Sequence, residues 1–175
     1  MCETVVRPTL QGMKDEGIPF NGVLYTGLML TDNGPRVIEY NVRFGDPELQ
    51  AMLPLLDEDV YALIHDATTG LVRSPKLKQV STALVVLASK DYPESSEGGP
   101  EIIGLDQSHD SIEVFHAGTK LDQDGAVRAS GGRVLNIVGK GVEREQALRV
   151  AYQQIKAGFG NFEGMQFRGD IGSNL

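Results

Sequence analysis

The sequence has little cysteine, few positive charges and no long apolar run. Its one cysteine, Cys2, cannot form an internal disulfide or a thiolate metal cluster, and this fits a cytoplasmic protein. Lys and Arg number 16 against 24 Asp and Glu, so the net charge of -8 argues against a nucleic-acid partner. No apolar run approaches the ~20 residues of a membrane span, so no membrane partner is expected.

The composition that remains is typical of a soluble globular chain. The 175 residues are 41% hydrophobic and 23% charged, which is enough to bury one moderate core or two small ones. No repeat of 20 to 50 residues is visible, so the sequence does not indicate a solenoid.

Alternating helix and strand signals fill the first half of the chain. Apolar residues at helical spacing predict a short amphipathic helix over residues 3–16. Two apolar runs, 22–30 and 36–43, flank a short segment of turn-forming residues at 31–35. Strands joined by so short a turn are most simply an antiparallel hairpin.

A second helix and a linker follow the hairpin. The helix is expected from about Asp57, whose carboxylate could cap it, to the Thr69-Gly70 pair. Residues 72–79 contain a Ser-Pro pair and three basic residues, which is typical of a linker. We therefore predict a domain boundary near Lys76.

The second half of the chain is predicted to be α+β. Apolar, β-prone segments predict strands at 81–88, 112–117 and 133–138. A helix is predicted over 143–156, because its apolar residues form one stripe that would pack on a sheet. The stripe consists of Ala147, Leu148, Ala151, Tyr152 and Ile155.

Polar residues gather on one face of the predicted strand 37–43. Side chains alternate across a strand, so Glu39, Asn41 and Arg43 project from the same face. Carboxylate and amide oxygens are ligands that Mg²⁺ accepts, and a guanidinium can hold a phosphoryl or carboxylate group through paired hydrogen bonds. A solvated face with a surface ion pair worth ~0 to 1 kcal/mol is the alternative, and spacing alone favours it.

The residues that follow this strand add two carboxylates, Asp46 and Glu48, next to the permissive Gly45. These carboxylates could belong to the same site. They could equally cap the start of a helix, where acidic side chains are stabilising.

The whole run from Asn21 to Gln50, NGVLYTGLMLTDNGPRVIEYNVRFGDPELQ, resembles the ATP-grasp strand pair of the phosphoribosylamine-glycine ligase family. VFHAGTKL, GGRVLNIVGKG and FEGMQFRGDIG resemble that family's C-terminal domain, in the same order. The resemblance implies an α+β fold: the second half of an ATP-grasp domain in residues 1–75, then a small, mostly β C-terminal domain with a packed helix in residues 76–175.

The activity that this resemblance implies is ATP-dependent joining of glycine to 5-phosphoribosylamine, giving glycinamide ribonucleotide, ADP and phosphate through glycyl phosphate. Glu39 and Asn41 match the family's Mg²⁺ or Mn²⁺ ligands, and Arg43 would stabilise the phosphoryl or acyl-phosphate group. Asp46 and Glu48 would serve the glycine and amine end of the site as catalytic carboxylates.

Two features of the resemblance are incomplete or open. Many ATP-grasp proteins carry another acidic ligand on the preceding strand, but residues 22–30 contain no carboxylate and Leu28 lies roughly at that position. Metal affinity without nucleotide should therefore be poor. His116 could border the site, although a structural histidine is the alternative. Arg133 could face a phosphate, although a hairpin corner explains the two glycines before it equally well.

The chain contains no recognisable phosphate-covering glycine-rich loop, adenine-contacting segment or phosphoribosylamine-binding domain. We therefore expect the missing N-terminal part of the same enzyme as a partner, and no activity from this chain alone. The alternative is a non-catalytic remnant or interaction module. Another ATP-grasp ligase, such as a carboxylase subunit, is disfavoured because it would share Glu-x-Asn-x-Arg without RFGDPE and VFHAGT.

Overall fold

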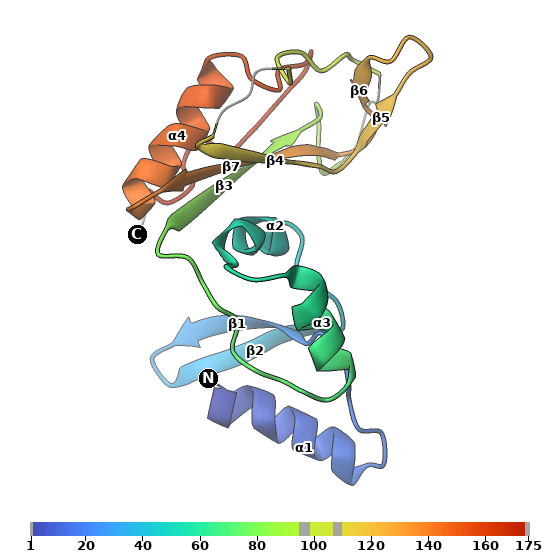
Figure 1. Ribbon diagram of the computed structural model, residues 1–175, viewed down its shortest axis with the longest axis vertical. Helices are drawn as coiled ribbons and strands as arrows, with labels where there is room; N and C mark the ends of the chain where they lie inside the picture. Colours follow the sequence, from blue (N-terminus) through green and yellow to red (C-terminus); the bar gives the residue numbers. More distant parts are fainter. Residues whose placement is uncertain (1, 95–98, 107–109, 174–175) are drawn as a thin grey trace. The chain divides into compact units, whose positions relative to one another are not determined.

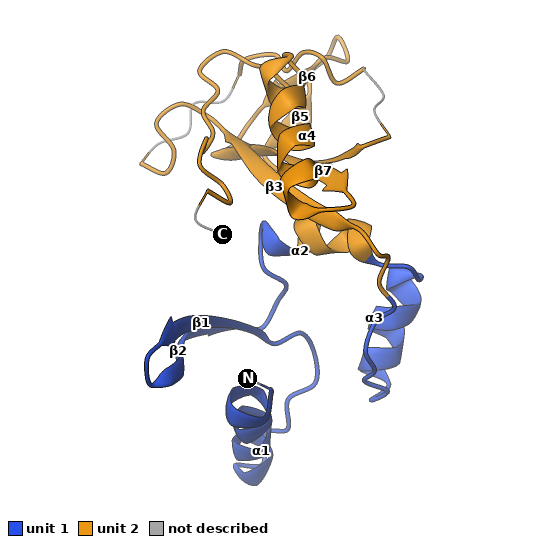
Figure 2. Ribbon diagram, turned by 90° about the vertical axis from the view of Figure 1, so that its left-hand side faces the viewer, with its two compact units in different colours: residues 1–48, 56–76 blue, residues 49–55, 77–175 orange. Residues whose placement is uncertain are grey.

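A computed structural model describes residues 2–94, 99–106 and 110–173. The chain forms two compact units: unit 1 comprises residues 1–48 and 56–76, and unit 2 comprises residues 49–55 and 77–175 (Figure 2). Both combine helices with antiparallel strands, so the α+β class is confirmed. The domain assignment of 1–75 and 76–175 stays a prediction. No helix in the described part is long and apolar enough to cross a membrane.

Unit 1 consists of a helix, a hairpin and a second helix (Figure 1). The predicted N-terminal helix is a π-helical turn followed by an α-helix, and Gly17, at φ +79°, follows its end. The hairpin is antiparallel with Thr31 opposite Gly34 and an irregularity between Gly27 and Leu28. The elements of unit 1 are η1 (Cys2–Val6), α1 (Arg7–Asp15), β1 (Tyr25–Thr31), β2 (Gly34–Asn41) and α3 (Val60–Thr68).

The prediction that Asp57 caps α3 is wrong. Asp59 is the N-cap, with an extended backbone, and its carboxylate accepts a hydrogen bond from the Ala62 amide at 3.0 Å. Asp57 lies two residues further out, and its amide donates to the Lys76 carbonyl at 2.9 Å. The predicted end of the helix is confirmed, because Thr69 is the C-cap and Gly70 has φ +87°.

Unit 2 is a three-stranded antiparallel sheet covered on one face by a helix (Figure 1). The strand order is β3-β7-β4, so β7 is central and forms hydrogen bonds on both sides. A separate hairpin pairs β5 with β6. Unit 2 holds most of the short helix α2 (Glu48–Met52) and all of η2 (Leu53–Leu55), β3 (Ser81–Ala88), β4 (Ile112–His116), β5 (Thr119–Leu121), β6 (Val127–Ala129), β7 (Arg133–Gly141) and α4 (Arg144–Lys156).

The apolar core of the described chain lies in unit 2. The alternate residues Leu135 and Ile137 of β7 are fully buried, and Ala147 and Ala151 of α4 are buried as the predicted stripe requires. A Cβ at Gly139 would come within 2.8 Å of the Ala151 amide nitrogen, so a residue without a side chain lets the helix approach the strand closely.

Unit 1 has almost no buried interior. Within its described residues only Val5 and Gly45 are buried. On β2, Ile38 is 63% exposed, and Val42, just beyond the strand, is 73% exposed. Apolar side chains that would ordinarily face a core are therefore open to solvent in this unit.

Candidate functional site

Two of the predicted site residues touch on strand β2. Asn41 Nδ2 donates a hydrogen bond of 3.0 Å to Glu39 Oε1, so the two side chains lie on the same face of the hairpin. This bond uses the nitrogen of the Asn41 amide. The amide oxygen, Asn41 Oδ1, and the second carboxylate oxygen of Glu39 remain as hard oxygen ligands for a metal ion.

The partner strand makes room for the Glu39 side chain. Gly27 is the residue directly opposite Glu39, and a Cβ at Gly27 would lie 3.1 Å from Glu39 Cγ. Leu28, by contrast, pairs with Val37. The position across from the carboxylate therefore carries no side chain at all, in agreement with the absence of an acidic ligand on the preceding strand.

Arg43 follows β2 by two residues and is exposed. Its Nη1 donates to the Phe44 carbonyl at 2.8 Å, which holds the guanidinium near the start of the 44–48 segment. The guanidinium has five donors, so this single bond leaves most of them for a ligand.

Glu48 is joined to the hairpin by a residue that the sequence analysis did not single out. The Tyr25 hydroxyl donates to Glu48 Oε1 at 3.0 Å, and Tyr25 lies opposite Asn41 in the β1–β2 register. The hydrogen bond to Glu48 and the negative charge of Glu48 raise the pKa of Tyr25 above its usual range, and Glu39 adds to the rise, whereas Arg43 opposes it. All three charged groups therefore act on one hydroxyl.

Tyr25 can be recognised as a site residue only from the strand register of the hairpin. In the sequence it is one member of an apolar strand-forming run, and hydropathy does not distinguish it from its neighbours. The length of the 31–35 turn sets the register as far as Leu28, but the irregularity between Gly27 and Leu28 shifts the pairing by one residue and so places Tyr25 opposite Asn41. Asp46 is exposed and lies in the same loop, between β2 and α2.

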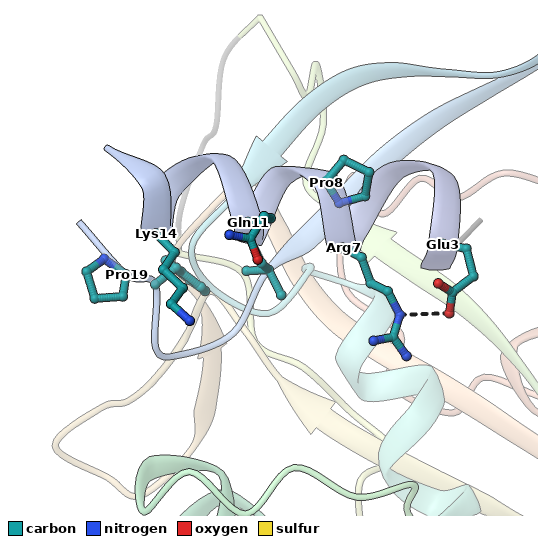
Figure 3. A pocket seen from close by; sticks show the side chains of 8 residues that line it. Glu3, Arg7, Pro8, Gln11, Lys14 and Pro19 are labelled. Atoms are coloured by element: carbon teal, nitrogen blue, oxygen red, sulfur yellow. Dashed lines mark hydrogen bonds and ion pairs between the residues drawn. The ribbon is translucent and has the colours of Figure 1, made fainter. Parts of the chain in front are cut away.

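A surface depression at a different location lies along the N-terminal helix. It measures about 630 Å³ and runs along α1, where Arg7 is held by Glu3 in an ion pair of 2.7 Å (Figure 3). Its wall also includes Lys14 and Pro19. None of the predicted site residues lines this depression, and its charged groups are solvated, so it does not alter the assignment of the site to the hairpin.

The two open candidates in unit 2 have structural contacts. His116, at the end of β4, lies with Nδ1 3.0 Å from Thr119 Oγ1. Arg133 begins β7, and its carbonyl accepts from the Gly118 amide at 2.8 Å. Their functional roles stay predictions.

Comparison with known proteins gives two family matches. Residues 82–174 match the model of "Phosphoribosylglycinamide synthetase, C domain", and residues 1–49 match that of "Phosphoribosylglycinamide synthetase, ATP-grasp (A) domain". The first match alone covers more than half of the chain, and the second includes the whole Glu39–Glu48 region.

Individual relatives agree with these matches. The chain is 43% identical over 171 residues to a phosphoribosylamine--glycine ligase of Caldanaerobacter subterraneus subsp. tengcongensis, and this match covers 97% of the chain but 40% of the relative. It is 44% identical over 176 residues to the human trifunctional purine biosynthetic protein adenosine-3, with coverage of 97% and 17%. A crystal structure of phosphoribosylamine--glycine ligase from Thermotoga maritima superimposes with a TM-score of 0.77 at 35% identity, covering 93% of this chain and 40% of that chain.

Proposed function

Because the chain belongs to the phosphoribosylglycinamide synthetase family, we propose that it is the part of an ATP-dependent ligase that carries the metal- and phosphoryl-binding strand. The observation that carries the proposal is the Glu39–Asn41 contact on β2, which places a carboxylate and a side-chain amide side by side inside the segment matched by the ATP-grasp model. The proposed reaction joins glycine to 5-phosphoribosylamine, with ATP cleaved to ADP and phosphate.

The donor set of β2 fits a divalent cation. Glu39 and Asn41 would hold Mg²⁺ or Mn²⁺ through oxygen atoms, and the ion would neutralise charge on the phosphates of bound ATP. Among the described residues, no group of three or more His, Cys, Asp and Glu side chains could hold a metal ion. Nucleotide phosphates and water would therefore supply the remaining ligands, and affinity without nucleotide would be weak.

The other site residues are assigned by charge. We assign Arg43 to the phosphoryl group that moves from ATP to the glycine carboxylate, because its free donors can bind two oxygens at once. Glu48 and Asp46 are assigned to the amine end of the site, where a carboxylate can bind an ammonium group or accept a proton from the attacking amine.

We further propose that residues outside this chain complete the nucleotide site. The chain spans about 40% of the length of the Caldanaerobacter relative, and its ATP-grasp match covers residues 1–49. The exposed apolar residues of the hairpin support this proposal, because such residues ordinarily pack against another layer. The N-terminal part of the enzyme would provide that layer, in a cytoplasmic protein.

A chimera tests the proposed function on this chain itself. The chain would replace the matching segment of the Caldanaerobacter relative, and ADP formation would be followed with ATP, glycine and phosphoribosylamine, omitting each substrate in turn. We expect turnover that requires all three substrates in the chimera and no turnover from the isolated 175 residues. A chimera that unfolds cooperatively on heating yet shows no turnover would contradict the proposal, as would turnover by the isolated chain.

A further inference from the structure

The Tyr25 hydroxyl links β1 to the first residue of α2. It donates to Glu48 Oε1 at 3.0 Å, while its residue sits opposite Asn41 on the face that carries Glu39. The sequence pattern places these groups on separate segments. In the folded hairpin, the Tyr25 side chain connects the proposed metal face with the proposed amine-binding carboxylate.

Gly45 allows the carboxylate and the tyrosine ring to meet. A Cβ at this position would lie 2.9 Å from Glu48 Cδ and 2.9 Å from Tyr25 Cε2, closer than real Cβ contacts. Gly45 is also one of the few buried residues of unit 1. The Glu48 carboxylate therefore lies against the Gly45 backbone, beside the tyrosine ring, in space that a side chain would fill.

The hydrogen bond restricts a side chain that would otherwise be mobile. Glu48 is exposed, and an exposed glutamate samples several rotamers, which an ordered site must suppress at an entropic cost. A hydroxyl that donates to one carboxylate oxygen fixes the group, and because a carboxylate has about four lone-pair sites, acceptor capacity remains for a ligand.

We propose that Tyr25 is a positioning residue, which holds the Glu48 carboxylate beside the Glu39–Asn41 face so that this carboxylate binds the amino group of a substrate. The inference rests on the proposed function for the identity of that substrate, glycine or phosphoribosylamine. Tyr25 acts through Glu48 and touches no reacting atom itself.

Tyr25 must stay protonated to donate this bond. The Glu48 carboxylate next to it raises the pKa of Tyr25, so the hydroxyl keeps its proton throughout the neutral range.

The functional test is the Tyr25→Phe variant of the chimera. Removing a hydrogen bond of ordinary strength predicts a roughly threefold to tenfold higher KM for glycine or phosphoribosylamine, with the KM for ATP unchanged. Tyr61→Phe is the matched control, because Tyr61 is 76% exposed on α3. If the KM values for glycine and phosphoribosylamine are unchanged, the proposal is overturned, whether or not kcat falls.

A double-mutant cycle distinguishes positioning from a general effect on the hairpin. If Tyr25 acts through Glu48, the Tyr25→Phe change should have little further effect on KM once Glu48→Gln is present. If the two changes multiply, Tyr25 acts independently of Glu48 and the proposal is wrong.

A third measurement needs no ligase activity. Tyrosine ring signals of the isolated chain would be titrated by NMR, and Glu48→Gln should lower the pKa of Tyr25 toward its usual range, because the carboxylate is the main cause of its rise. An unchanged Tyr25 titration would overturn this inference. A chimera without turnover would instead count against the proposed function, so the two failures are distinguishable.

Discussion

Arg43 presents a planar fork of donors that a lysine cannot reproduce. In the chimera, Arg43→Lys should lower kcat about tenfold or more, because one ammonium cannot bind two oxygens of a transferring phosphoryl group in the same geometry. Steady-state kinetics with ATP as the varied substrate would measure the change. Arg36→Lys is a matched control, since Arg36 is an exposed arginine on β2, the strand that precedes Arg43. Equal kinetics for the two variants would remove Arg43 from the phosphoryl site.

For single residues, strand alternation predicted the Glu39–Asn41 contact of the site but could not predict the contact between Tyr25 and Glu48. Glu39 and Asn41 are two residues apart on one strand, so period 2 alone places them on one face, and the structure joins them at 3.0 Å. Tyr25 and Glu48 are 23 residues apart, and their contact depends on the hairpin register and on the path of the loop through Gly45. A single sequence pattern does not contain that path.

Helix α3 illustrates how a local rule can select the wrong neighbour. Asp57 and Asp59 both precede the helix, and either can serve as an N-cap by composition, but only Asp59 has its carboxylate on the Ala62 amide. Asp59→Ala should therefore cost about 1 kcal/mol of helix stability. Hydrogen exchange of the α3 amides would measure it, with Asp57→Ala as the control. A larger loss in the control would return the cap to Asp57.

The segment after α3 is held to the helix region by charge. Arg73 bonds to Glu58 at 2.6 Å and to Asp66 at 3.2 Å, and the Lys76 amide donates to Glu58 at 2.5 Å. The Arg73 guanidinium, and after it the Lys76 amide, hold the pKa of Glu58 below its usual range. A lowered pKa means that the stabilisation is complete above the unfolded pKa, about 4.3, and is lost as pH falls through the folded pKa.

NMR can follow this loss at the Lys76 amide. Its chemical shift should stay constant from neutral pH down to about pH 4.3 and change only below it. The Glu58→Gln variant should abolish the transition, because no carboxylate remains to titrate. A transition centred above that pH, or one that persists in the variant, would show that Glu58 does not hold the segment through its charge.

Short elements were the ones that the sequence did not predict. Strands β5 and β6 have three residues each, and α2 has five. Such segments are too short to show the hydrophobic periodicity of a strand or of a helix. The β5–β6 hairpin is instead held by Asp122, whose carboxylate accepts from Arg128 Nε and from the Ala126 amide. Longer elements such as β3 and α4 were predicted within a residue or so, because burial imposes a clear pattern on them.

Among the described residues, one unit has a buried apolar core and the other has almost none. Leu135 and Ile137 of β7 are fully buried, whereas Met29 and Ile38 of the hairpin are 55% and 63% exposed. Native-state hydrogen exchange of the isolated chain should therefore give strong protection for β7 amides and weak protection for β1 and β2 amides. The β1–β2 hairpin and β7 are both hydrogen-bonded in antiparallel ladders, so equal protection of their amides would mean that burial does not govern local stability here.

At the scale of the molecule, the motifs indicate the family, but they cannot supply an interior for unit 1. Residues 22–43 contain two apolar, strand-forming runs, while the structure leaves both faces of their hairpin largely open. The pattern cannot identify the residues that would cover this hairpin. The hydropathy of a strand indicates that it is covered, but it does not indicate which segment covers it.

The central claim is that Glu39 on β2 is a metal ligand of a ligase, and the Mg²⁺ dependence of turnover tests it most directly. The measurement compares the chimera with its Glu39→Gln variant, using Glu163→Gln, at an exposed position in unit 2, as the control. We predict that Glu39→Gln lowers turnover and shifts half-activation to higher Mg²⁺, whereas the control follows the parent. Undiminished turnover with the same Mg²⁺ dependence in Glu39→Gln would remove Glu39 from the metal site.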